Sequence, residues 1–153
     1  MDVRGIRVRH FKAPGDVAAW LPLRERAMAG EKPAARSWAD DDFRREMLDK
    51  SWWRDEWTWL AIDDDAANGS IVGAVTLAVR AGSGGEVPVV HWLLVDPAWR
   101  RHGVGQMLMS HLERAAWDSG WREVQIETHA GWEAAVSFYQ SMGYAAVRDE
   151  SPR

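Results

Sequence analysis

Residues 90–106 read VHWLLVDPAWRRHGVGQ, and this stretch decides the fold class. Its apolar run to Val95 predicts the end of a strand, residues 96–102 predict a loop, and Gly103 begins a predicted helix. The first turn of a helix exposes unpaired backbone N–H groups and the positive end of the helix dipole. Two glycines separated by one residue let that backbone close on a phosphate, so the stretch predicts a pyrophosphate site.

Two other phosphate-binding motifs fit this stretch poorly. A P-loop ends in Gly-Lys-Ser/Thr, whereas the second glycine here is followed by Gln106 and Met107. The dinucleotide fingerprint needs Gly or Ala three residues after the second glycine, where this chain has Leu108, and no suitable βαβ unit precedes it. A nucleotide-binding protein is therefore the least favoured interpretation of this stretch.

The rest of the chain supplies the elements around this stretch. The first half has a strand Ile6–Phe11, a helix from Asp16 to about Ala29 with a break or kink at Pro22, a helix capped by Ser37, and strands Glu56–Ile62 and Ile71–Arg80. The second half has a strand Val87–Val95, a helix Gly103–Ser119, a strand Trp121–Thr128, a helix Trp132–Met142 and a last strand Tyr144–Arg148. This order predicts one α/β (α+β) domain over residues 1–153. Its sheet is mixed and mostly antiparallel, with helices on both faces.

Composition excludes several classes of protein. The chain has 153 residues, 23 acidic and 19 basic groups, a net charge of -4 and no cysteine. Disulfides, thiolate metal sites and a cysteine nucleophile are excluded, and the charge disfavours nucleic-acid binding. No apolar run approaches the ~18 residues that span a membrane. The start of the chain lacks the apolar core of a signal peptide, so we expect a cytoplasmic protein.

Two segments resemble one known superfamily. Residues 100–105, RRHGVG, look like the Gln/Arg-x-x-Gly-x-Gly/Ala motif of the GCN5-related N-acetyltransferases (GNAT), and Leu93-Leu94-Val95-Asp96-Pro97 resembles its usual lead-in. Downstream, residues 134–144, AAVSFYQSMGY, are similar to the superfamily's Ala-…-Phe-Tyr-…-Gly-Phe/Tyr segment. The resemblance is strong over about residues 88–148, and over residues 1–80 it is limited to the order of elements.

The resemblance implies acetyl-CoA as co-substrate, with no metal. Backbone N–H groups from Arg101 to Gln106 would bind the pyrophosphate, and the main chain at 93–95 would pair with the pantetheine arm where two strands splay apart at a bulge. The full set of expected coenzyme contacts is Leu93, Leu94, Val95, Arg100, Arg101, His102, Gly103, Val104, Gly105, Gln106, Trp132 and Ala135.

Tyr139 matches the position of the superfamily's general acid. Attack of an amine on a thioester expels a thiolate, and a nearby hydroxyl can protonate it. Spacing alone favours a core tyrosine instead, because Tyr139 shares a helical stripe with Ala135, Phe138 and Met142.

His91 is the expected base, acting through water. Some aralkylamine-acetylating members carry a histidine at the matching position, and imidazole titrates in the useful range. His91 lies four residues before Val95, so a regular strand would place both on one face. A hydrogen-bonded sheet histidine is the alternative, and Glu127 and His129 are rival bases.

Two features depart from the superfamily. Trp132 stands where members often have an asparagine that holds the pantetheine or thioester, and tryptophan has no carbonyl-type acceptor. The superfamily usually ends in a hairpin, whereas only residues 149–153 follow the last predicted strand. The sheet is therefore expected to lack its last strand, or a partner chain covers the edge in a homodimer.

The acceptor site is the least determined part. Trp52, Trp53, Trp57 and Trp59 would form an aromatic wall suited to arylalkyl or cationic amines, or they replace other large core residues. Nearby acids attract an amine or cap a helix: Asp40, Asp41, Asp42 and Glu56.

The sequence therefore predicts an enzyme that transfers an acetyl group directly from acetyl-CoA to a primary amine on a small molecule or peptide, in a ternary complex. A non-catalytic acyl-CoA sensor or regulatory domain of the same fold is the alternative.

Overall fold

The computed structural model describes residues 3–30, 36–66, 69–82, 84–127 and 133–145. In chain order, its elements are strand β1 (Ile6–His10), helix α1 (Val17–Met28), helix α2 (Asp40–Phe43), a π-helical turn (Arg44–Leu48), a 3₁₀ turn (Asp55–Trp57), strands β2 (Thr58–Asp63), β3 (Ser70–Gly82) and β4 (Gly85–Val95), a 3₁₀ turn (Pro97–Trp99), helix α3 (Val104–Asp118), strand β5 (Gln125–Ile126) and helix α4 (Glu133–Ser141).

The described strands form one sheet in the order β1-β2-β3-β4-β5. Neighbours from β1 to β4 run antiparallel, and β4 and β5 run parallel. The predicted mixed and mostly antiparallel sheet is confirmed. Pairing between β4 and β5 covers only two residue pairs, Val89 with Gln125 and Val90 with Ile126.

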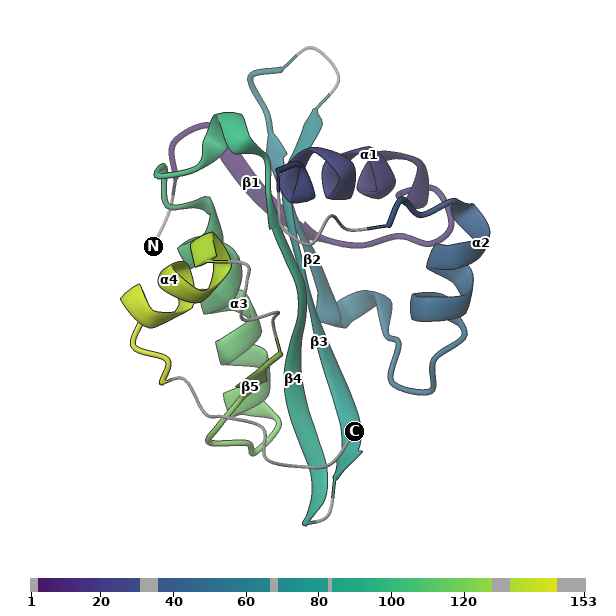
Figure 1. Cartoon of the computed structure of the whole chain (residues 1–153), viewed down its shortest axis with the longest axis vertical. Coiled ribbons are helices and arrows are strands. Elements are labelled where there is room, and N and C mark those ends of the chain that lie inside the picture. Colours follow the sequence, from purple (N-terminus) through teal and green to yellow (C-terminus); the bar gives the residue numbers. More distant parts are fainter. Residues whose placement is uncertain (1–2, 31–35, 67–68, 83, 128–132, 146–153) are drawn as a thin grey trace.

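Helices cover both faces of this sheet (Figure 1), with α1 and α2 on one side and α3 and α4 on the other. Each face therefore buries its own core. The α1/α2 face is centred on Trp20, Leu23, Phe43 and Leu60. The α3 face is centred on the largely aliphatic set Val75, Leu77, Val90, Leu108 and Leu112. Burying each of these side chains contributes about 1.5–3 kcal/mol.

Two expectations about the first helices were wrong. Helix α1 runs through Pro22 without a break. Interior proline costs about 3 kcal/mol, and the full burial of Trp20 and Leu23 on the same helix offsets it. Ser37 does not cap α2, whose first residue follows Ala39; the Asp42 carboxylate accepts the Ala39 backbone N–H at 2.8 Å.

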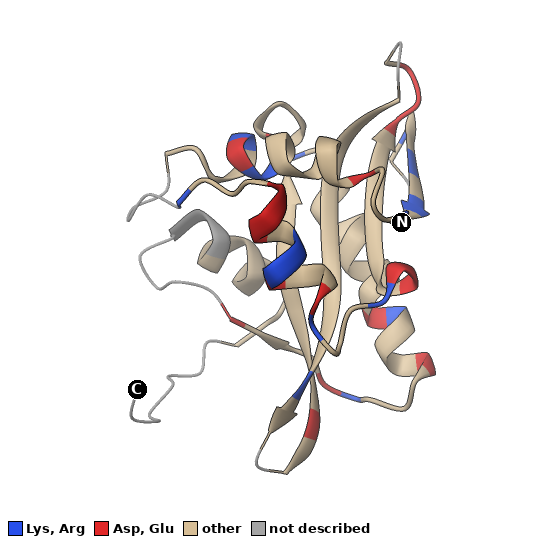
Figure 2. Cartoon of the chain, turned by 90° about the vertical axis from the view of Figure 1, so that its right-hand side faces the viewer, with Lys and Arg blue, Asp and Glu red and all other residues tan. Residues whose placement is uncertain are grey.

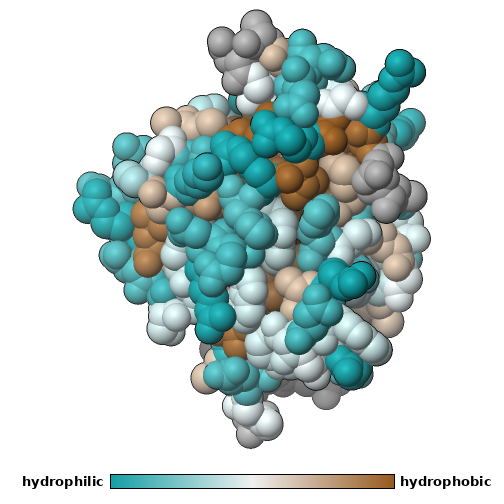
Figure 3. Space-filling view, turned by 180° about the vertical axis from the view of Figure 1, so that it is seen from behind, coloured by the Kyte–Doolittle hydropathy of each residue, from teal (hydrophilic) through white to brown (hydrophobic). Residues whose placement is uncertain are grey.

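The end of the chain is described only in part. Tyr144 and Ala145 are in no strand, and residues 146–148 of the predicted last strand lie outside the described residues. Viewed from behind, the surface is mostly hydrophilic, with hydrophobic side chains showing in its upper part (Figure 3). Within the described ranges, no helix is both long and apolar enough to cross a membrane.

Candidate active site

A β-bulge interrupts β4 at Trp92. His91 pairs with Thr76 and Leu94 pairs with Ala74, so two residues of β4 oppose one of β3. Trp92 has a φ of 51°, which is rare for a residue with a side chain. The extra residue reverses the alternation of faces. His91 therefore lies on the α1/α2 face with Leu94, and the expectation that it shares a face with Val95 was wrong.

Beyond this bulge, β4 and β5 separate. Their two residue pairs end at Val90, so the described structure gives residues 91–95 no strand partner on the β5 side. Leu93 and Val95 pack on the α3 core, and Leu94 is buried on the opposite face. The main chain of the three residues expected to pair with pantetheine is thus available for hydrogen bonds on that side.

A loop of residues 100–106, called the phosphate loop below, leads into α3. Its backbone takes left-handed conformations at Arg101 (φ 66°) and Gly103 (φ 85°). The Arg100 N–H bonds the Pro97 carbonyl at 3.4 Å, and the next N–H along the chain to bond a backbone oxygen is that of Met107, which bonds the Gly103 carbonyl at 3.0 Å. Among the described residues, the N–H groups of residues 101–106 have no hydrogen-bond acceptor. Together with the helix dipole, they form a cradle for an anion.

The side chains of this loop act differently from its main chain. The Arg100 guanidinium donates to the Ala27 carbonyl at the end of α1, at 2.7 Å. His102 packs against Trp99, with ring centroids 5.5 Å apart. Arg100, one of the expected coenzyme contacts, thus anchors the loop to α1.

Gly105 has a packing role that the sequence did not reveal. A β-carbon added there would lie 2.7 Å from the Phe138 ring of α4. The missing side chain therefore lets α4 pack closely on the start of α3. Because Tyr139 follows Phe138 in α4, this close packing places Tyr139 near the start of α3.

The Tyr139 side chain is largely buried, and burial raises its pKa above the ordinary value of 10. Its ring lies 6.3 Å from that of Tyr144. The Tyr144 hydroxyl donates to Glu113 of α3 at 2.9 Å, which ties the end of α4 to α3. Tyr139 keeps its proton at neutral pH, as a proton donor must.

His91 lies among aromatic and charged side chains. Its ring centroid is 5.4 Å from Trp52 and 5.7 Å from Trp92. Burial, together with the charges of Arg80 and Lys50, lowers its pKa from 6.5 to about 4. The imidazole is therefore neutral at pH 7 and a weak base.

Arg80 joins two of the predicted catalytic residues. It contacts His91 Nδ1 at 3.3 Å and donates to the Glu127 carboxylate at 2.7 Å. Arg80 was not singled out from the sequence, because its partners come from β4 and from the residue just after β5. Only the sheet register brings these three residues together.

Comparisons with known proteins identify the family of this chain. The profile of the Acetyltransferase (GNAT) family matches residues 22–144. The chain belongs to the GNAT acetyltransferase family. It is 31% identical to a mycothiol acetyltransferase of Nocardiopsis dassonvillei over 97% of this chain and 48% of that protein. The chain thus spans about half the length of the curated relatives it matches.

Solved GNAT structures share the fold. A GNAT-family acetyltransferase from Staphylococcus aureus superposes with a TM-score of 0.75 at 17% identity, covering 96% of this chain and 89% of that one. The aminoglycoside N-acetyltransferase AAC(6')-Iy in complex with CoA gives 0.71 at 18% identity, covering 100% and 97%. The resemblance drawn from the sequence and the fold class are confirmed.

The tryptophans of this GNAT domain do not form one wall. Trp52 packs beside His91, whereas Trp53 packs in the α1/α2 core, 5.3 Å from Phe11. Trp57 and Trp59 pack on the α3 face instead. Among the described residues, Trp52 is the one of these four tryptophans that contacts a predicted catalytic side chain.

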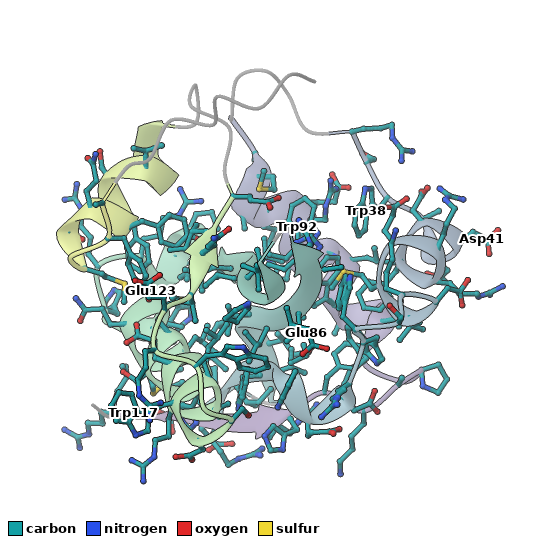
Figure 4. All side chains as sticks on the ribbon, turned by 90° about the horizontal axis from the view of Figure 1, so that it is seen from below. Trp38, Asp41, Glu86, Trp92, Trp117 and Glu123 are labelled. Carbon is teal, nitrogen blue, oxygen red and sulfur yellow. The ribbon has the colours of Figure 1, made fainter. Side chains whose placement is uncertain are left out.

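A second aromatic group adjoins the bulge. Trp38, which precedes α2, and Trp92 lie 5.2 Å apart on the same side of the sheet (Figure 4). The Arg24 guanidinium lies over both rings, 4.5 and 4.7 Å from their centroids. Such contacts are worth about 0.5–2 kcal/mol each. They fix the Trp92 side chain, and with it the bulge.

The remaining expected site residues have other placements. Acidic residues begin α2, and two arginines follow after Phe43 (Figure 2), so residues 40–42 sit where the helix dipole favours acids. Trp132 and His129 lie outside the described residues, and of Ala135 only the backbone is described, in α4.

Proposed function

We propose that this domain transfers the acetyl group of acetyl-CoA to a primary amine by direct attack in a ternary complex. The proposal depends on the N–H groups of residues 101–106, which have no partner among the described residues, and on the nearby edge of β4, where pairing with the described part of β5 ends. The family match and the CoA complex of a fold neighbour support it.

The coenzyme would be held mainly by main chain. The N–H groups of the phosphate loop suit the pyrophosphate, because helix N-termini bind anions. The open edge of residues 93–95 suits the two amide groups of pantetheine. When bound, the coenzyme supplies an activated acetyl thioester.

Tyr139 is the proposed general acid. The amine nitrogen forms a bond to the thioester carbonyl carbon, and the carbon–sulfur bond breaks with its electron pair on sulfur. The Tyr139 hydroxyl gives its proton to that thiolate. Because burial raises its pKa, Tyr139 regains a proton from solvent readily and is ready for the next turnover.

The amine must lose its own proton before it attacks. His91 and Glu127 are the described residues proposed for this step, and Arg80 contacts both. A histidine with a pKa of about 4 holds a proton poorly, so the proton must pass on to solvent. The free amine is then the form that reacts, and we expect the rate to rise with pH until the amine is deprotonated.

The acceptor is proposed to be a small-molecule or peptide amine. Trp52 beside His91 offers an aromatic surface to it. Relatives are named mycothiol acetyltransferases, and some fold neighbours act on aminoglycosides. These two classes, with arylalkylamines and peptide α-amines, make up the panel to test.

Release of CoA thiol from acetyl-CoA in the presence of each amine tests the proposal. We expect thiol release with at least one amine and N-acetylated product in equal amount, identified by mass spectrometry. Tight binding of acetyl-CoA without turnover on any amine would favour the sensor alternative. Displacement of the coenzyme by ATP or NAD would favour a nucleotide-binding protein.

A further inference from the structure

Arg80, His91 and Glu127 form a row on one face of the sheet. The register pairs Arg80 with Val87 and His91 with Thr76, so both side chains lie on the α1/α2 face. Arg80 reaches across β4 to Glu127, just after β5. The row therefore crosses the sheet close to where β4 and β5 stop pairing.

The chemistry of arginine fixes the direction of the contact with His91. A guanidinium has N–H donors and no acceptor. In the 3.3 Å contact between Arg80 and His91 Nδ1, the ring nitrogen must therefore accept. A neutral imidazole that accepts at Nδ1 carries its hydrogen on Nε2.

We propose that Arg80, held by Glu127, is a positioning residue that keeps His91 as the Nε2–H tautomer, so that His91 donates a hydrogen bond to an oxygen of the acceptor substrate. This proposal deepens the proposed function, on which its substrate part rests. It predicts an acceptor with a hydroxyl or carbonyl oxygen near its amine. It replaces the proton-accepting role considered above for His91 and leaves Glu127 or solvent to take the proton of the amine.

The charged groups around His91 favour this neutral donor. Arg80 faces it from β3 and Lys50 from the turn after Leu48, and both oppose protonation of the ring. Glu127 faces it only across Arg80 and is engaged there. Trp52 and Trp92 flank the ring without charge.

Nitrogen chemical shifts of the imidazole ring test the tautomer without any substrate. In the ¹⁵N-labelled wild type, we expect His91 Nδ1 to lack a hydrogen and Nε2 to carry one from pH 6 to 8. In Arg80→Met, we expect a mixture of tautomers and a pKa that rises from about 4 toward 6.5. His91 signals are assigned by their loss in His91→Gln.

Arg7→Met is the matched control, because Arg7 also lies on a strand and forms a surface ion pair, with Asp64 at 3.2 Å. It should leave the His91 signals unchanged. Glu127→Gln should give a smaller change than Arg80→Met, because Arg80 stays in place. A hydrogen on Nδ1 in the wild type, or unchanged signals in a folded Arg80→Met variant, overturns the proposal.

Two substitutions of His91 separate a donor from a base. Glutamine retains an N–H donor, whereas leucine retains none. For an acceptor that turns over, we expect kcat/KM of His91→Gln to exceed that of His91→Leu by about tenfold, mostly through KM, because one hydrogen bond is at stake. Equal losses in kcat would indicate a base and overturn the donor role. Absence of turnover in the wild type would count against the proposed function while leaving the tautomer test intact.

Discussion

The proposed coenzyme end of the site is made of main chain, and the proposed acceptor end is made of side chains. At the coenzyme end, six consecutive N–H groups and an open strand edge would do the binding. At the acceptor end, Trp52, His91, Arg80 and Glu127 come from four separate segments. A main-chain site depends on local conformation, whereas a side-chain site depends on how distant segments pack. The two ends should therefore respond differently to substitution.

Gly103→Glu should have the largest effect, at the main-chain end. A side chain at φ 85° strains the loop, and a carboxylate enters the proposed phosphate site. We expect acetyl-CoA affinity, measured by calorimetry, to fall by about a hundredfold or more, equivalent to roughly 3 kcal/mol. Gly120→Glu is the control, because Gly120 ends the same helix with a φ of 96° and open space around it. Equal losses in both variants would contradict the assignment.

Tyr139→Phe should lower kcat by about 10²–10⁴-fold, because the leaving thiolate loses its acid. Coenzyme affinity should stay the same, since binding at the main-chain end needs no hydroxyl from α4. Steady-state rates and calorimetry measure the two quantities separately. Tyr144→Phe is the matched control; it loses the bond to Glu113 and about 1 kcal/mol of stability. A kcat unchanged in Tyr139→Phe would remove Tyr139 from the mechanism.

His91 should make stability depend on pH at the side-chain end. Its pKa is lowered from 6.5 to about 4 in the folded chain, so the unfolded chain binds more protons between these values. The contribution of the neutral His91 ring to the free energy of unfolding is therefore largest above pH 6.5. It decreases as pH falls toward 4, by up to roughly 3 kcal/mol. Denaturant unfolding should show a flatter pH dependence in His91→Gln. His10→Gln, at another strand histidine packed on a tryptophan, is the control. An unchanged slope in His91→Gln would contradict the burial of a neutral ring.

Gly105→Ala should have the smallest effect on coenzyme binding and act on stability instead. Its β-carbon would meet the Phe138 ring at 2.7 Å, and overpacking typically costs about 1–3 kcal/mol. Thermal unfolding should show a lower Tm, and adding Phe138→Leu should restore part of it. A coenzyme affinity lowered as far as in Gly103→Glu, with Tm unchanged, would mean that both glycines serve the phosphate.

The difference between a main-chain end and a side-chain end also explains which features the sequence predicted correctly. The order of strands and helices and the glycine motif are local patterns, and from Val87 to Ser119 they placed β4, the loop and α3 correctly. The bulge at Trp92 has no local signal, so the face of His91 was predicted wrongly. Tertiary packing also overrode the helix-breaking tendency of Pro22.

The arrangement of side chains at the acceptor end was harder to predict from the sequence. Trp52 and Trp57 are close in sequence, yet the 3₁₀ turn at Asp55–Trp57 leads onto the other face of the sheet. Arg80 gave no signal because its partners lie 11 and 47 residues away. Charged residues on strands are common at surfaces, and only the register distinguishes this one.

Backbone amide shifts on adding CoA to ¹⁵N-labelled protein test whether the phosphate loop binds the coenzyme. We expect the amides of residues 101–106 to move furthest, toward lower field, as their N–H groups bond the pyrophosphate. Saturable CoA binding that leaves these six amides in place and moves others instead would contradict it.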